Sequence, residues 1–221
     1  MATAKLSILG SDYIGAFSLA NDSFSLVCKS STKGEHSAMV RNLEVPVHDF
    51  TVNGSDLIGI YAACNSHSLI LPSATYASEA KAIKKQLDDV NVAVFDTDLN
   101  ALGNNILAND RRAIINPNYS SKEAKKIADI MDVEVVKMGV GGFETVGANN
   151  LLTNSGIVLN NRVTEEEEAL LKELFKSVSQ STANLGALSI GLCAIANSKG
   201  LLVGRATTGH ELVSMSEGLG F

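Results

Sequence analysis

The chain has 221 residues, of which 45% are hydrophobic and 19% are charged, with three prolines and no tryptophan. Lys and Arg number 18 against 24 Asp and Glu residues, and the resulting net charge of −6 disfavours non-specific binding to nucleic-acid phosphates. The three cysteines form no C-x-x-C pair, the N-terminus lacks the apolar core of a signal peptide, and the most apolar run, residues 187–196, is too short to span a membrane. The composition therefore excludes secreted, membrane-spanning, collagenous and disordered proteins and indicates a cytoplasmic globular protein.

One pattern repeats along the whole chain after a first strand-like segment at residues 5–9. An aliphatic–Gly turn, which we expect to open a first strand such as residues 105–108, recurs every 44 residues, at Gly15, Gly59, Gly103, Gly147 and Gly191. A tight turn follows each glycine, at residues 21–22, 65–66, 109–110, 154–156 and 197–198, where Asn tolerates the left-handed conformation. The fourth turn is preceded by one extra residue. A second strand comes next, with Leu26, Ile70, Ile114, Val158 and Leu202 at matching positions.

A capped amphipathic helix follows the second strand in every repeat. The pattern S/T-x-x-E opens four of the five helices, at Thr32, Ser120, Thr164 and Thr208, and Tyr76 replaces the hydroxyl residue in the second. Apolar residues recur in register within these helices, at Met39, Ile83, Ile127, Leu171 and Met215. The run of glutamates at 165–168 fits the first turn of a helix, where the helix dipole favours negative charge. A third strand follows, as at residues 91–95 and 133–136.

The repeats predict five ββαβ modules in a single domain, 1–221, with approximate bounds 10–53, 54–97, 98–141, 142–185 and 186–221. Module five lacks a third strand, and the segment 1–9 lies where a third strand should precede module one. We therefore expect this segment to complete module five and to close a five-fold pseudosymmetric α/β propeller. The alternative is an open solenoid, but its terminal repeats should be atypical caps, and these repeats are regular.

Motifs for catalysis or cofactor binding are nearly absent. Residues 139–142 are glycine-rich, yet Glu144 breaks the pattern G-x-G-x-x-G, and no phosphate-binding P-loop occurs. The four histidines have no ligand spacing, so we expect no metal and no cofactor. Cys193 and Cys64 lie in apolar surroundings, at places we predict to be equivalent and buried in strands. A cysteine nucleophile needs a nearby cation or His and partial exposure, so we predict that the protein is not an enzyme.

Several motifs together resemble translation initiation factor 6 of archaea and eukaryotes. They comprise residues 101–104 (A-L-G-N), 145–149, 152–156, 196–200 and 207–212. The resemblance implies the pentein ring and a non-catalytic, monomeric factor. Such a factor binds the large ribosomal subunit and blocks its joining to the small subunit, with a role in subunit biogenesis or recycling. It also implies contact with a β-barrel ribosomal protein near the sarcin–ricin loop, while the negative charge of the chain predicts little direct binding of rRNA. An acidic factor is electrostatically suited to a basic ribosomal protein.

The candidate ribosome-binding residues follow from the resemblance and the repeats together. Asn104 matches the family's contact asparagine, and the residues directly after the five repeated glycines differ from one another. Since packing alone does not require this difference, we predict a binding site that includes Asn104, Gly103, Ile60 and Ala148.

Two other functions stay open from the sequence. One is a guanidino-modifying enzyme of the same ring fold that uses a cysteine nucleophile, and the other is a scaffold ring for a different partner. The chain ends at Phe221 directly after the fifth predicted helix, so regulation through a tail rich in Ser and Thr is not expected, and the chain resembles archaeal members.

Overall fold

The computed structural model describes residues 2–221 and contains five three-stranded sheets. In each sheet the first strand pairs antiparallel with the middle strand, and the third strand pairs parallel with it on the other side. In modules one to four the three strands follow one another along the chain. They are β2 (Ser18–Ala20), β3 (Ser25–Cys28) and β4 (Val47–Phe50); β5 (Ala63–Cys64), β6 (Ser68–Pro72) and β7 (Asn91–Phe95); β8 (Ile106–Ala108), β9 (Arg112–Ile115) and β10 (Glu134–Lys137); β11 (Leu151–Leu152), β12 (Ile157–Asn160) and β13 (Val178–Ser181).

The fifth sheet joins the two ends of the chain. Strand β1 (Ala2–Leu6) pairs parallel with β15 (Gly200–Gly204), whose other neighbour is β14 (Ala194–Ala196). The predicted pairing of the N-terminal strand with module five is therefore confirmed, but the strand covers residues 2–6 rather than 5–9. The chain turns at Leu9 and Gly10, which have φ of 52° and 77°, so the strand cannot reach Leu9. Met1, which the predicted segment includes, lies outside the described residues.

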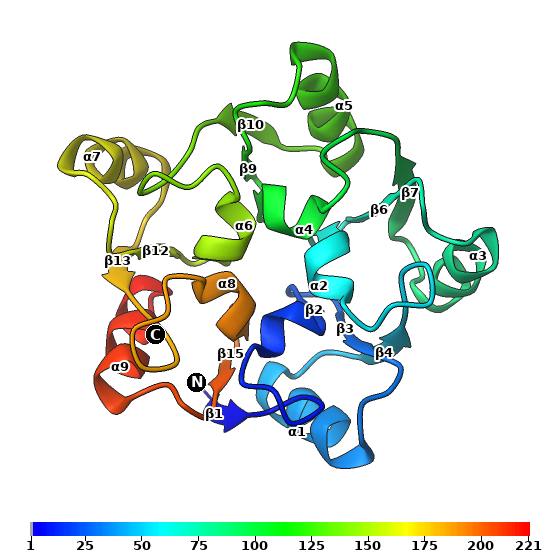
Figure 1. Ribbon diagram of the computed structural model, residues 1–221, viewed down its shortest axis with the longest axis horizontal. Helices are drawn as coiled ribbons and strands as arrows, with labels where there is room; N and C mark the ends of the chain where they lie inside the picture. The colour runs from blue at the N-terminus through cyan, green and yellow to red at the C-terminus, as the bar shows by residue number, and fades with distance from the viewer. Residues whose placement is uncertain (1) are drawn as a thin grey trace.

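Each module carries one long helix on the outside of the ring (Figure 1). The bounds are α1 (Lys33–Leu43), α3 (Ala77–Gln86), α5 (Ser121–Met131), α7 (Glu165–Leu174) and α9 (Gly209–Gly218). Four of these helices begin with the predicted reciprocal cap, as in Thr32, whose Oγ1 accepts from Glu35 N while its own N–H donates to the Glu35 carboxylate. In α3 the N–H of Tyr76 donates to Glu79, but the Tyr76 side chain forms no capping bond.

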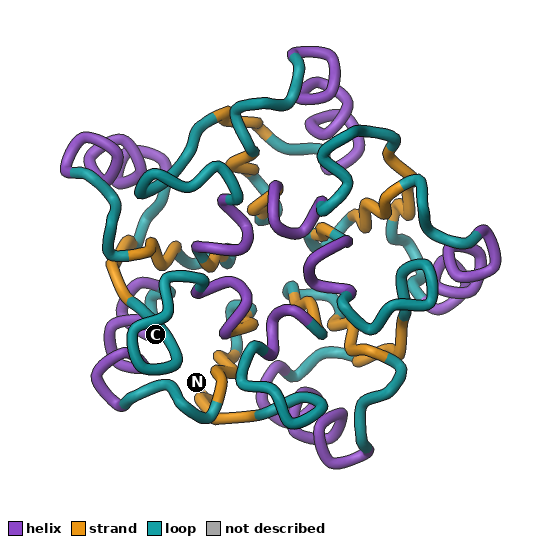
Figure 2. The backbone as a smooth tube through the Cα atoms, viewed as in Figure 1, coloured by secondary structure: helices purple, strands orange, loops and turns teal. Residues whose placement is uncertain are grey.

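The aliphatic–Gly segments, predicted as turns, are single helical turns around the centre of the molecule (Figure 2). They are η1 (Ile14–Ala16), α2 (Ile58–Tyr61), α4 (Leu102–Asn105), α6 (Val146–Asn149) and α8 (Ile190–Cys193). These short helices and the loops that precede them, within residues 8–16, 52–60, 96–104, 140–148 and 183–192, form what we call the short-helix face. The tight turns that follow the first strand of each sheet form the opposite face, which we call the turn face.

The hydrophobic core lies between neighbouring modules. Each of the five buried clusters combines side chains of two adjacent modules, and one of them joins Leu202 of module five to Met39 of module one. The largest fully buried side chains include Tyr119 and Phe95, which pack edge to face. Burial of apolar area is the main stabilising contribution in such cores, so each module depends on both of its neighbours.

Two predictions of detail are wrong. The fourth tight turn begins at Thr153, whose N–H donates to Gly156 O at 2.9 Å as Asn109 N does to Arg112 O. Thr153 lies 44 residues after Asn109, and the side-chain amide of Asn109 donates to the carbonyl oxygen of Thr153. No extra residue therefore precedes this turn. Cys193 is the last residue of α8 rather than a strand residue, and it is not at the place of Cys64 in β5.

Candidate functional site

The short helices touch one another around the axis of the molecule, and glycines make this possible. Each short helix contacts the next, and α8 of module five contacts η1 of module one. A Cβ atom on Gly59 would overlap the carbonyl oxygen of Gly15, and the same holds for each of the other four glycines and its neighbour. The glycines therefore permit close backbone packing between modules.

The predicted site residues lie on three consecutive short helices. Gly103 and Asn104 belong to α4, Ile60 to α2 and Ala148 to α6, and α4 contacts both of the other helices. Asn104 and Ile60 are half-buried, whereas Ala148 is only 6% exposed. The structure thus brings the four residues together, and Asn104 and Ile60 are more exposed than Ala148.

Asn104 differs from the residues at the same place in the other modules. These are Ala16, Ile60, Ala148 and Leu192, all apolar. The buried Oδ1 atom of Asn104 has no hydrogen-bond partner within residues 2–221. An amide without a bond inside the protein is not explained by folding, since unpaired buried polar groups cost free energy.

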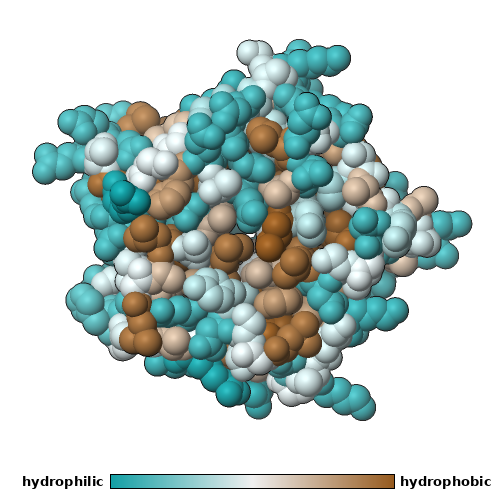
Figure 3. Space-filling view, in the orientation of Figure 1, coloured by the Kyte–Doolittle hydropathy of each residue, from teal (hydrophilic) through white to brown (hydrophobic). Residues whose placement is uncertain are grey.

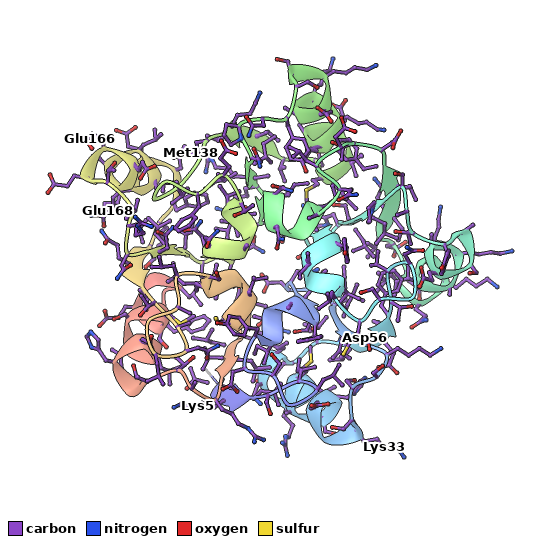
Figure 4. All side chains as sticks on the ribbon, in the orientation of Figure 1. Lys5, Lys33, Asp56, Met138, Glu166 and Glu168 are labelled. Carbon is purple, nitrogen blue, oxygen red and sulfur yellow. The ribbon has the colours of Figure 1, made fainter. Side chains whose placement is uncertain are left out.

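Hydrophobic residues gather around the centre of the short-helix face, and polar residues surround them (Figure 3). Charged side chains such as Lys33, Glu166 and Glu168 lie at the outer edge of the molecule (Figure 4). An apolar centre with a polar rim is the usual composition of a protein–protein interface.

Five glutamates hold the loops of the short-helix face. Each one accepts hydrogen bonds both from the cap of its own helix and from the loop 25 to 29 residues earlier; they are Glu35, Glu79, Glu123, Glu167 and Glu211. Glu79, for example, accepts from the N–H groups of Asn53 at 2.8 Å and Gly54 at 2.9 Å. The sequence predicts these residues as caps but not as braces for the preceding loop.

Glu211 is the most strongly perturbed of these carboxylates. Burial raises its pKa, since the side chain is 6% exposed, but hydrogen bonds from Thr208, Thr182 and Gly186 outweigh burial and lower the pKa to about 2. The carboxylate therefore stays ionised at neutral pH and holds the loop before α8.

The turn face is held by a second set of polar contacts. Side-chain amides of Asn21, Asn65 and Asn109 each donate to the backbone carbonyl 44 residues later, and Asn197 donates to Asn21 O. Thr153 has no amide to continue this series. The sequence analysis predicts only turn conformation for these asparagines, although their spacing of 44 residues is a signal for the series.

Beside this series, Asn154 joins three modules at once. Its Nδ2 donates to Asp22 at 2.7 Å and also to Asp110, while its Oδ1 accepts from Asp110 N at 3.0 Å. Asp22 also accepts from the N–H and hydroxyl of Ser198. Polar side chains of modules one, three, four and five therefore pair with one another across the turn face.

The space between the two faces is small. A cavity of about 90 Å³ along the axis is lined by the five repeated glycines and by small and aliphatic residues in or next to the first strands. A second cavity, of about 20 Å³, lies at the turn face beside Asp22, Asp110 and Asn154. Drug-sized ligands need several times this volume.

The cysteines are unsuited to nucleophilic chemistry. Burial raises the thiol pKa to about 11 in Cys28 and Cys64 and to about 12 in Cys193, and a thiol must ionise to attack. Within residues 2–221 no three His, Cys, Asp or Glu side chains are grouped so that they could hold a metal ion. In the same range, no helix has the length and apolar character needed to cross a membrane.

A structural comparison supports the fold. The chain is similar to the crystal structure of a dimethylarginine dimethylaminohydrolase adduct with S-methyl-L-thiocitrulline, with a TM-score of 0.51 and 11% sequence identity. The match covers 94% of this chain and 73% of the other. At this identity the likeness shows the shared pentein-type α/β fold and nothing of the activity.

Sequence comparisons give closer relatives. The chain is 37% identical to translation initiation factor 6 of Pyrococcus horikoshii over the full length of both proteins. It is 34% identical to that of Thermococcus onnurineus, covering 100% of this chain and 99% of the relative, and 36% identical to that of Thermoplasma acidophilum, covering 94% and 95%. A profile described as the eIF-6 family matches residues 3–218. With a repeated α/β fold, a face of packed short helices and relatives of this kind along its whole length, the chain belongs to the eIF-6 family of translation factors.

Proposed function

We propose that this protein binds the large ribosomal subunit through its short-helix face and thereby prevents the small subunit from joining. The observation that carries the proposal is Asn104, a polar residue at a place that is apolar in the other four modules, whose Oδ1 is unpaired within the described chain. Membership of the eIF-6 family supports the same assignment.

Blocking subunit joining requires bulk and rigidity rather than chemistry. Backbone-to-backbone packing of the short helices and braces from five glutamates keep the face in one conformation. A pre-ordered face loses little conformational entropy when it binds. The raised thiol pKa values support a non-enzymatic role.

The partner we propose is mainly a β-barrel ribosomal protein of the subunit interface near the sarcin–ricin loop, with little direct contact to rRNA. The net charge of −6 supports this choice, because it favours a basic protein surface and is repelled by exposed phosphates. We further propose that the protein acts as a cytoplasmic monomer in initiation, in subunit biogenesis or in recycling.

Sucrose-gradient sedimentation tests the function directly. Purified archaeal large and small subunits are mixed with and without the protein, and fractions are assayed for the protein and for joined ribosomes. We expect co-migration with the large subunit and a lower yield of joined ribosomes. Co-migration with the small subunit alone, or an unchanged yield at saturating protein, contradicts the proposal, and stable association with a non-ribosomal partner favours a scaffold role instead.

A further inference from the structure

Leu185 is the most exposed of the large hydrophobic residues in the described chain, at 75%. It lies on the short-helix face, in the loop between β13 and α8, and its φ of 65° places it in the left-handed region. That conformation is unfavourable for residues with a Cβ and is least so for Asn and Asp. Neither burial nor backbone conformation therefore favours leucine at this position.

The same position in other modules shows what backbone conformation alone selects. Module two has Asn53 with φ 53° and module four has Gly141 with φ 63°, both residue types that suit the left-handed region. Module one has Leu9, with φ 52° and 42% exposure. Leucine is thus used in two modules where the fold accepts Asn or Gly, and these two modules are joined by the pairing of β1 with β15.

The loop that carries Leu185 is held on both sides. Glu211 accepts from the N–H of Gly186 at 2.9 Å and of Leu185 at 3.4 Å. The side-chain amide of Asn184 donates to Asp12 O at 2.8 Å, which fixes the loop against module one. These three hydrogen bonds fix the loop in a conformation in which the Leu185 side chain is exposed to solvent and the Leu185 backbone is left-handed.

We propose that Leu185 is an apolar anchor that inserts into an apolar depression on a protein of the large ribosomal subunit. The inference rests on the proposed function and adds a second contact on the short-helix face, in module five, to the one at Asn104. An exposed apolar side chain on a pre-ordered loop releases water on binding and loses little entropy.

The occupant is a protein rather than RNA. A leucine side chain offers neither a hydrogen bond nor a positive charge to a phosphate, and the protein as a whole carries a charge of −6. Apolar depressions that accept an aliphatic side chain are typical of protein surfaces at interfaces.

The substitution Leu185→Asn tests the anchor, because it supplies the residue that module two uses at this position. Expected results are a roughly ten- to hundredfold weaker affinity for the large subunit, the range for one buried leucine side chain, and a thermal midpoint equal to or above that of the parent. Val213→Asn is the matched control, since Val213 is 56% exposed on α9, outside the short-helix face. It should leave the affinity unchanged.

The outcomes separate the inference from the function on which it rests. If the parent binds the large subunit and Leu185→Asn binds equally well, the anchor is refuted while the proposed function stands. A lower thermal midpoint together with weaker binding assigns Leu185 to the fold and also overturns the anchor. If the parent itself does not bind, both proposals fail.

A photo-crosslinking amino acid at position 185 identifies the class of the occupant. We expect the crosslinked product to resist ribonuclease and to be degraded by protease to a peptide of one large-subunit protein. A crosslink that ribonuclease removes shows contact with rRNA and overturns the assignment to a protein.

Discussion

Asn154 and Asp22 are 132 residues apart in the chain, and the side-chain amide of the first donates to the carboxylate of the second at 2.7 Å. The same amide also donates to Asp110, so one side chain links modules one, three and four across the turn face. Without this amide, two carboxylates would face each other beside a cavity of about 20 Å³.

The first prediction concerns this link. We expect Asn154→Ala to lower the free energy of unfolding by about 1–3 kcal/mol, the cost of leaving charged acceptors without their donor. The thermal midpoint should fall by roughly 2–4 °C for each kcal/mol. Asn161→Ala, which changes an exposed asparagine in the turn at the other end of β12, is the control. Equal midpoints for the two variants would show that the link does not stabilise the fold.

The second prediction concerns the packing of the short helices. Ala at position 59 would place its Cβ against the carbonyl oxygen of Gly15, so we expect Gly59→Ala to lower the free energy of unfolding by about 1–3 kcal/mol or more. Gly209→Ala is the control, because no atom lies within 4 Å of its added Cβ and α9 begins there. That variant should be neutral or slightly more stable. Thermal unfolding measures both, and a harmless Gly59→Ala contradicts the packing.

The third prediction uses the lowered pKa of Glu211. Its pKa is about 2 in the folded protein, below the ordinary value of 4.5, so its stabilisation is present above pH 4.5 and is lost as pH falls toward 2. The shift corresponds to about 3 kcal/mol. We expect Glu211→Gln to be clearly less stable than the parent at pH 7, with the difference shrinking below pH 4.5.

Chemical denaturation between pH 7 and pH 2 measures this difference. Glu35→Gln is the matched variant, because Glu35 has the same capping position in module one but is only half-buried. A stability difference between Glu211→Gln and the parent that is constant across this pH range would falsify the assignment.

The fourth prediction concerns Asn104. We expect Asn104→Lys to weaken binding of the large subunit at least about tenfold, corresponding to about 1.4 kcal/mol, because a positive charge then faces a basic partner. The thermal midpoint should change little, since Asn104 Oδ1 has no partner to lose within residues 2–221. Gln86→Lys adds the same charge at an exposed position of α3 and should bind normally. If Asn104→Lys and Gln86→Lys co-sediment with the large subunit with equal affinity, the role of Asn104 is refuted.

The fifth prediction concerns the N-terminal strand. Deleting residues 1–9 removes β1 from β15 and takes the buried side chains of Leu6 and Ile8 from the core. We expect loss of most of the stability, measured as a lower and broader thermal transition. A synthetic peptide of residues 1–9 added in trans should raise the midpoint again. A truncated chain that unfolds at the parental temperature contradicts the contribution of this strand.

The repeat explains how much of the fold could be predicted from sequence. Spacings of 44 residues assign Gly15 and Gly59 to equivalent positions of two modules, and Thr32 and Thr208 to the caps of equivalent helices. The prediction failed at Thr153, because the asparagine used as a marker for the turn lies one residue late, and the backbone bond to Gly156 defines the turn instead.

The polar contacts of the site could not be predicted in this way. The bond between Asn154 and Asp22 joins equivalent positions three repeats apart, but the residue type there changes from module to module, so the spacing does not tell which two side chains pair. Likewise, the S/T-x-x-E pattern explains why Glu211 begins a helix, but it does not contain the loop residue Gly186 to which the same carboxylate binds. Such contacts depend on how modules meet in space.

The hydrogen bonds of the five glutamates also bear on whether the modules unfold separately or together. Each carboxylate joins its helix to the loop that leads from the preceding module into its own, so we expect the opening of one module to release this loop as well. Amide hydrogen exchange at loop N–H groups that donate to these carboxylates, such as those of Asn53, Gly141 and Gly186, should therefore occur with the free energy of global unfolding rather than in separate steps. We therefore expect a molecule built of five similar modules to unfold as a single unit.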